Sequence, residues 1–270
     1  MKDTRGVRVR AAIFASVCAL LLFMVSLLPH PPSPPLPQSN PAKILPVIAP
    51  MIASENTEMT QHNMNAPLLT TVKVRDDIAN FLETDGMRTG VELGVREGEF
   101  AHTILSRWFS CTKYVLVDLW KHQENYADDA NKDDSAQENT MQRALETLEN
   151  FKDKIEICRN YTTSCATQYP DDFFDFIYVD ARHDFKGVAE DLSAWWPKLK
   201  AGGVFGGHDY VTNDDGPLQS GQNWALNYDG SVDPLGRAVK GAVDDFAISV
   251  NRQIVVTYRE SGWNSWFLRK

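Results

Sequence analysis

The sequence predicts an α/β protein in which a mostly parallel sheet carries helices on both faces. Short apolar runs with the character of buried strands alternate with longer segments whose apolar residues recur at helical spacing. This alternation is typical of parallel strands joined by crossover helices. The chain ends in two apolar runs joined by the turn Ser261-Gly262, which predicts one antiparallel pair. The folded domain is expected to begin near Val72 and to reach Lys270.

The expected strands are short runs rich in Val, Ile, Leu, Phe and Tyr. They cover residues 90–95, 114–119, 155–158, 174–180, 203–207, 253–259 and 265–269. The expected helices present apolar side chains every three or four residues, as Phe100, Ile104 and Trp108 do after the first strand. They cover residues 74–85, 99–108, 141–151, 164–169, 187–199 and 235–250. The turn Lys200-Ala201-Gly202 is expected to precede the fifth strand.

The N-terminal part of the chain has the composition of a membrane anchor followed by a stem. Residues 1–10 form a basic tail, and residues 11–28 contain no charged residue, a length at the lower edge of a membrane-spanning helix. Residues 29–71 are rich in Pro, Ser, Asn and Thr, as in a disordered stem. The basic tail predicts a single-pass type II membrane protein facing the lumen of the endoplasmic reticulum or Golgi. A cleaved secretory signal and an organelle transit sequence are the alternatives.

Charge and cysteine usage exclude some classes of function. The net charge is −9 and no run of Lys and Arg offsets it, so no nucleic-acid partner is expected. The four cysteines show no metal-type spacing. Because Cys18 lies in the apolar N-terminal run, at most one bridge can form among Cys111, Cys158 and Cys165, and free buried thiols are the favoured interpretation.

The stretch TGVELGVREGEF, residues 89–100, predicts a buried strand, a glycine turn and the start of a helix. Gly94 and Gly98 do not complete the G-x-G-x-x-G dinucleotide fingerprint, so a phosphate cradle is weakly indicated. Glu92, just before the first glycine, suits a ligand with positive charge and hydroxyl groups. Asp118 ends the next strand, where a carboxylate can accept the two hydroxyls of a ribose. A helix N-cap is the alternative role for Asp118.

The ends of the fourth and fifth strands carry a second group of polar residues. Asp180, His208 and Asp209 can bind a divalent cation, either Mg²⁺ or a transition metal that suits histidine, or they can merely hydrogen-bond to one another. His183 can act as a general base, because an imidazole titrates near neutral pH, or it can be an exposed loop residue.

Three further segments have a predicted role. Trp195 and Trp196 are expected to pack on the sheet rather than to bind a ligand. The sequon at Asn160 is expected to be unmodified, because it lies where a cofactor is expected to bind. The loop 213–230, with Trp224 and Tyr228, is expected to cover the acceptor.

Three segments together resemble the class I S-adenosylmethionine-dependent methyltransferases. They are VELGVREGEFA, YVLVDLW and the long run from DFFDFIYVDARHD to GGVFGGHDY, and the likeness covers residues 72–270. The closest resemblance is to members whose fifth strand ends in a GGHDY-like sequence. It implies a Rossmann-like seven-stranded sheet whose last strand is antiparallel. It also implies that S-adenosylmethionine is bound by Glu92, Gly94, Gly98, Asp118, Thr163 and Ser164, with the last two near the adenine.

The metal-dependent O-methyltransferases within this class carry cation ligands where Asp180, His208 and Asp209 stand here. They carry a basic residue three positions after the strand-four aspartate, which implies a catalytic role for His183 together with Asp180. His208 replaces a usual aspartate, which leaves the metal and its requirement open. The expected function is methyl transfer to a hydroxyl of a small molecule or glycan. A metal-dependent hydroxylase and an inactive cofactor-binding domain are the alternatives, and the sequence indicates no oligomeric state.

Overall fold

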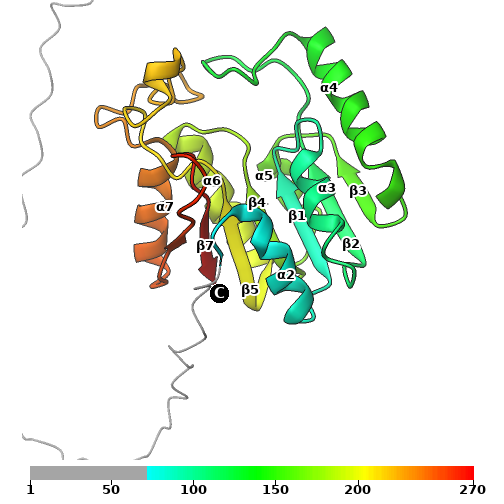
Figure 1. Cartoon of the computed structure of the whole chain (residues 1–270). Helices are drawn as coiled ribbons and strands as arrows, with labels where there is room; N and C mark the ends of the chain where they lie inside the picture. Colours follow the sequence, from blue (N-terminus) through cyan, green and yellow to red (C-terminus); the bar gives the residue numbers. More distant parts are fainter. Residues whose placement is uncertain (1–71) are drawn as a thin grey trace, which may run out of the picture. The chain divides into compact units, whose positions relative to one another are not determined.

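The computed structural model describes residues 72–270 (Figure 1). The predicted basic tail, signal anchor and stem, residues 1–10, 11–28 and 29–71, lie outside the described part. Among the described residues, no helix is both long enough and apolar enough to cross a membrane.

The described chain alternates between strands and helices, as the sequence predicted. The strands are β1 (Thr89–Leu93), β2 (Lys113–Val117), β3 (Ile155–Cys158), β4 (Phe174–Val179), β5 (Leu199–Gly207), β6 (Val255–Val256) and β7 (Trp266–Arg269). The α-helices are α2 (Ile78–Thr84), α3 (Glu99–Leu105), α4 (Asp134–Thr147), α5 (Thr162–Ala166), α6 (Phe185–Trp195) and α7 (Ala238–Ser249). Short 3₁₀ turns are η2 (Arg75–Asp77), η3 (Glu149–Phe151), η4 (Trp196–Lys198) and η5 (Leu218–Ser220).

The seven strands form one sheet in the order β3-β2-β1-β4-β5-β7-β6. The first five strands are parallel, and β7 runs antiparallel to both β5 and β6. The prediction of a Rossmann-like seven-stranded sheet with an antiparallel last strand is therefore confirmed. The strand order reverses between β1 and β4, and a crevice at that point is where open α/β sheets bind ligands.

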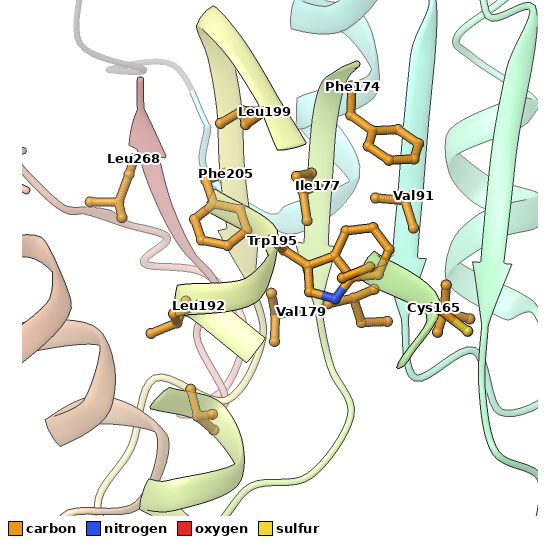
Figure 2. Packing of buried hydrophobic residues seen from close by; sticks show 14 of the residues in the cluster. Val91, Cys165, Phe174, Ile177, Val179, Leu192, Trp195, Leu199, Phe205 and Leu268 are labelled. Carbon is orange, nitrogen blue, oxygen red and sulfur yellow. The ribbon is translucent and has the colours of Figure 1, made fainter. Parts of the chain in front are cut away.

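Alternate residues of the strands pack into two cores, one on each face of the sheet. One core contains Tyr114, Leu116 and Tyr178 together with α2 and α3, and the other contains Val115, Val117 and Ile177 together with α5, α6 and α7. In Figure 2, Trp195 of α6 lies over the sheet near Ile177 and Val91. Trp195 and Trp196 both belong to this second core, so their predicted packing role is confirmed.

The strand bounds that differ most from the prediction are those of β5 and β6, each for a local reason. β5 begins at Leu199, and the expected turn at residues 200–202 is an irregularity inside the strand, where the pairing with β4 shifts register and Gly202 has a φ of +79°. β6 covers only two residues, because the backbone N–H groups of Tyr258 and Arg259 donate to the Lys73 carbonyl instead of extending the ladder.

The favoured interpretation of free thiols is wrong for two of the cysteines. Cys158, at the end of β3, and Cys165, in α5, form a disulfide, while Cys111 is free and buried. The two thiols lie only seven residues apart, and the tight β3–α5 connection brings them together. Sequence spacing alone does not reveal this proximity.

Candidate functional site

The polar strand ends gather around two adjoining cavities at the carboxyl ends of β1, β2, β4 and β5. The first cavity, of about 410 Å³, is lined by Glu92, Asp180, His183, His208 and Asp209 among others. The second, of about 700 Å³, is lined by residues of the β3–α5 connection and of α6. Gly94 and Asp118 line both. The topology thus joins residues from four strands in one region.

Gly94 is required by the packing of two strand ends. It has a φ of +84°, and a Cβ at this position would lie 1.9 Å from the backbone oxygen of Asp180. Its own N–H donates to Val117, so β1, β2 and β4 are held together here. Gly98 has a different environment, because a Cβ there would meet Leu148 at 3.0 Å, and Gly98 lines neither cavity. The two glycines therefore have separate structural roles.

Glu92 is a buried carboxylate beside the first cavity. Only 2% of the residue is exposed, and among the described residues it accepts one hydrogen bond, from Tyr114 Oη at 3.2 Å. Burial, followed by the charge of Asp180, raises the pKa of Glu92 well above its usual range. A cationic ligand group in the cavity would stabilise the ionised form of this side chain.

Asp118 braces the glycine turn. Its Oδ2 accepts the backbone N–H groups of Val95 and Arg96 at 2.8 and 3.0 Å, and its Oδ1 accepts that of Trp120 at 2.8 Å. Arg96 and Trp120 both have positive φ values, so the carboxylate stabilises two strained residues. A carboxylate has about four acceptor positions, which leaves room for one further donor such as a hydroxyl. The alternative role as helix N-cap is wrong, because the next helix begins only at Asp134.

The four residues Asp180, His183, His208 and Asp209 form what we call the carboxylate–histidine cluster. Nε2 of His183 lies 3.4 Å from Asp180 Oδ1 and 3.4 Å from Asp209 Oδ2. One ligand atom from each of these three residues lies within 4.8 Å of the others, an arrangement that suits a cation. Nδ1 of His208 is turned to Asp209 Oδ1 at 2.9 Å and is not part of this group of three. The geometry thus provides His183, rather than His208, as the third possible cation ligand beside the two carboxylates.

Within the cluster, Asp180 and the imidazoles shift one another's pKa values. Burial by itself would raise the pKa of Asp180, but the hydrogen bond with His183 and the charges of His208, His183 and Arg75 lower it. Burial would lower the pKa of His183, yet its hydrogen bonds with Asp128 and Asp180, with a third carboxylate close by, raise it well above the usual value. The imidazoles and carboxylates of the cluster therefore stabilise one another's charged forms.

Residues of two loops, 121–133 and 213–230, line the first cavity, and we refer to these loops as the cover segments. Figure 1 shows the backbone of both loops. Asp128 of the first segment accepts hydrogen bonds from His183 Nδ1 at 3.0 Å and from Trp224 Nε1 of the second segment at 2.8 Å. The Trp224 indole lies over the His183 ring with centroids 4.2 Å apart. An isolated antiparallel bridge between Ala127 and Asn223 joins the segments directly. Trp224 of the loop 213–230 lines the first cavity and Tyr228 lines the second, while the role of this loop as a cover for the acceptor stays a prediction.

The second cavity is bounded by the residues between the two bridged cysteines. Asn160, Tyr161, Thr162 and Thr163 line it, whereas Ser164 is exposed and lines neither cavity. The Thr162 hydroxyl donates to Asp191, a carboxyl group of α6 that is only 3% exposed. Of the two residues expected near the adenine, the structure thus brings only Thr163 to the cavity.

Sequence reasoning missed three residues that contact the cluster. Arg75, from η2, lies 3.7 Å from Asp180 Oδ2. Tyr126 donates from its hydroxyl to the Ala181 carbonyl at 3.0 Å and lies 3.2 Å from His183 Nδ1. Asp128 is the third. Tyr126 and Asp128 lie in a loop without apolar periodicity and Arg75 at the start of the first helical segment, so only the folded chain shows what they contact.

Residues 91–210 match a family model described as a methyltransferase domain. No curated protein matches the chain. Among solved structures, a candidate O-methyltransferase of Nostoc punctiforme PCC 73102 is similar with a TM-score of 0.51 and 10% identity over 72% of this chain and 55% of that one. An O-methyltransferase family protein of Burkholderia thailandensis has a TM-score of 0.49 and 14% identity over 72% and 55% of the two chains. An O-methyltransferase of Bacillus cereus in complex with SAH has a TM-score of 0.48 and 16% identity over 72% and 80%.

The present chain spans only 55% of the length of the Nostoc and Burkholderia proteins. Identities this low establish the fold alone, so the family model and the observed topology carry the assignment. The matched range runs from the first strand to the end of the fifth, which are the segments that carry the resemblance. Residues 91–210 therefore match a methyltransferase domain, and the sheet topology agrees with the fold that the resemblance to class I S-adenosylmethionine-dependent methyltransferases implies.

Proposed function

We propose that the protein transfers the methyl group of S-adenosylmethionine to a hydroxyl of a small molecule or glycan, with a divalent cation at the carboxylate–histidine cluster. The observation that carries this proposal is the convergence of Asp180, His183 and Asp209 in the cavity that Glu92 and Gly94 also line. Carboxylate oxygens suit Mg²⁺ and Mn²⁺, and the imidazole adds affinity for a transition metal. The donor set therefore favours Mn²⁺ or Fe²⁺ over Mg²⁺.

The cofactor supplies an electrophilic methyl group, and a divalent cation supplies positive charge that favours the deprotonated form of a bound hydroxyl. The chain's own residues bind and orient the reactants. Glu92 offers its buried carboxylate to the cationic end of the cofactor, and Asp118 holds the turn against which the cofactor lies. Thr163 bounds the second cavity, which would hold the adenosine part. Catalysis in such a site comes from positioning and charge stabilisation.

His183 acts as a cation ligand in this proposal, although its position also allows the role of general base. Asp128 accepts the proton on Nδ1, which leaves Nε2 facing the two carboxylates of the cluster. A neutral imidazole in that tautomer presents a lone pair for a cation. Asp180 serves as a ligand and orients the acceptor hydroxyl.

Substitution of His183 tests both roles. The His183→Ala variant should bind S-adenosylmethionine like the wild type, since the proposal assigns the cofactor to Glu92, Asp118 and Thr163 and gives His183 no contact with it. If His183 is a ligand, Mn²⁺ affinity and turnover fall together, whereas a base role predicts unchanged Mn²⁺ affinity with lost turnover. Normal turnover would exclude both roles.

Product analysis tests the reaction class. Formation of S-adenosylhomocysteine in step with a methylated hydroxyl supports the proposal. An oxidised product without S-adenosylhomocysteine supports the hydroxylase alternative, and cofactor binding without any product supports an inactive binding domain.

A lumen-facing, membrane-anchored enzyme would meet glycans, and this is the reason for proposing a sugar hydroxyl as acceptor. The proposal rests on the N-terminal composition and on the GGHDY-type end of the fifth strand. Resistance of the full-length protein to carbonate extraction from membranes would support the anchor. Release into the soluble fraction would exclude it.

A further inference from the structure

Asp128 holds a central position among the contacts that surround His183. Its side chain is 4% exposed although it lies in a loop of mostly exposed residues. It accepts three hydrogen bonds: one from His183, one from Trp224 and one from the backbone N–H of Ala130 at 2.7 Å. A buried carboxylate in a surface loop is costly unless it is paired, so its environment requires these partners.

The contacts of Asp128 fix the orientation of the His183 ring. Nδ1 faces Asp128, and the Trp224 indole covers the ring face. The side chain of His183 is 12% exposed, so few other ring orientations are open to it. Metal-binding histidines commonly donate their second ring N–H to a carboxylate, which sets the tautomer and the direction of the lone pair.

The same carboxylate joins the two cover segments. Asp128 comes from residues 121–133 and Trp224 from residues 213–230. Three further hydrogen bonds join the segments: Asn223 N–H donates to the Ala127 carbonyl at 2.9 Å, Asp129 N–H to Gln222 Oε1 at 3.2 Å, and Asn125 Nδ2 to the Tyr228 carbonyl at 3.1 Å. Because Asp128 contacts both Trp224 of the second segment and His183, a shift of the His183 ring changes contacts that hold the two cover segments together.

We propose that Asp128 is a positioning residue that directs Nε2 of His183 to the cation and couples cation binding to closure of the cover segments. This inference rests on the proposed cation site at Asp180, His183 and Asp209. Asp128 does not touch the cation itself, and it acts through His183 on one side and Trp224 on the other. A bound cation would hold the His183 ring in one orientation. Through its contacts with His183 and Trp224, Asp128 would then restrict the motion of both cover segments.

Substitution of Asp128 by asparagine is a sharp test, because an amide cannot reproduce the three contacts. If its oxygen accepts from His183 and Trp224, its NH₂ group opposes the Ala130 N–H. If its NH₂ group faces His183 and Trp224 instead, two donors meet at the Trp224 N–H, and His183 has to carry its proton on Nε2. The second arrangement removes the acceptor for the His183 Nδ1 proton and should weaken cation binding 10–100-fold, the usual cost of losing such a partner. The first arrangement keeps that acceptor and should weaken cation binding less.

The experiment measures Mn²⁺ affinity of the full-length protein by the electron paramagnetic resonance signal of free Mn²⁺, with S-adenosylmethionine affinity by calorimetry as the check on folding. Asp128→Asn and Asp128→Ala should lose Mn²⁺ affinity and keep cofactor affinity. Asp153→Asn is the matched control, since its carboxylate is exposed, lines neither cavity and has no hydrogen bond among the described residues, and its Mn²⁺ affinity should stay within about twofold of the wild type. Trp224→Phe keeps the ring over His183 but removes the N–H, so a smaller loss is expected.

Hydrogen exchange of residues 121–133 supplies the second readout. Mn²⁺ should slow exchange there in the wild type and not in Asp128→Asn. Equal Mn²⁺ affinity of the wild type and Asp128→Asn would overturn the positioning role, and Mn²⁺-induced protection that persists in Asp128→Asn would overturn the coupling. If the wild type itself binds no Mn²⁺ while S-adenosylmethionine still binds, the cation part of the proposed function fails, and this inference fails with it.

Discussion

Gly94→Ala is the substitution whose effect follows most directly from the structure. The new Cβ would lie 1.9 Å from the backbone oxygen of Asp180 and 2.7 Å from the Cα of Ala181. Neither atom can easily withdraw, because Asp180 N–H is hydrogen-bonded to Leu93 at 2.7 Å and anchors β4 to β1. The clash therefore has to be relieved by moving the junction of the two strands on which both cavities depend.

Two contributions make up the expected loss of stability. A left-handed backbone costs an alanine about 1–2 kcal/mol, and overpacking against rigid neighbours costs about 1–3 kcal/mol more. Gly202→Ala isolates the first contribution, since Gly202 has a similar φ of +79° but open space around its Cβ position. The difference between the two variants should thus be about 1–3 kcal/mol, or about 2–12 °C in Tm for a domain of this size.

Thermal denaturation and calorimetric titration with S-adenosylmethionine measure the two effects. Gly94→Ala should have the lower Tm and should lose cofactor binding, while Gly202→Ala binds normally. If both variants have the same Tm and the same affinity, the close contact between Gly94 and the end of β4 does not constrain the fold as argued.

Three further predictions concern Asp118, the disulfide and Asp191. Asp118→Ala removes three hydrogen bonds to the glycine turn and its flank, which should cost about 2–4 kcal/mol in unfolding experiments and at least tenfold in S-adenosylmethionine affinity. Replacing Cys158 and Cys165 by serine should cost about 2 kcal/mol and weaken cofactor binding, because the residues between them line the second cavity. The pKa of Asp191 is raised to about 7 by burial, so the wild type should lose stability as pH rises between about 4 and 7. Asp191→Asn should remove that dependence.

For each of these three predictions, a specific result would contradict the reasoning. The sign for Asp191 follows because the unfolded state releases its proton near pH 4 while the folded state keeps it until about pH 7. If the free energy of unfolding changes with pH in the same way for Asp191→Asn and for the wild type from pH 4 to 8, Asp191 is not buried as a neutral acid. Unaltered affinity in Asp118→Ala, or after reduction of the disulfide, would show that these groups do not shape the cofactor cavity.

The sequence by itself determined the fold class and most of the elements. Parallel strands buried on both faces are near-continuous apolar runs, so β1, β2 and β4 stand out without tertiary information. The strand-end position of Asp118, Asp180 and His208 also follows from the chain, because a polar residue directly after such a run marks where the strand leaves the core. The family match over residues 91–210 agrees with that reasoning.

Only the tertiary structure decided which residues from other segments contact these strand ends. Gly94 and Asp180 lie 86 positions apart in the sequence, yet they are in contact because β1 and β4 are neighbours in the sheet. Asp128, Arg75 and the Cys158–Cys165 bridge depend on loops and turns, whose conformations follow no periodic pattern. Strands and helices are specified by local repeats of apolar side chains. The donor set of His183 and its neighbours arises from contacts between distant segments, so it exists only in the folded chain.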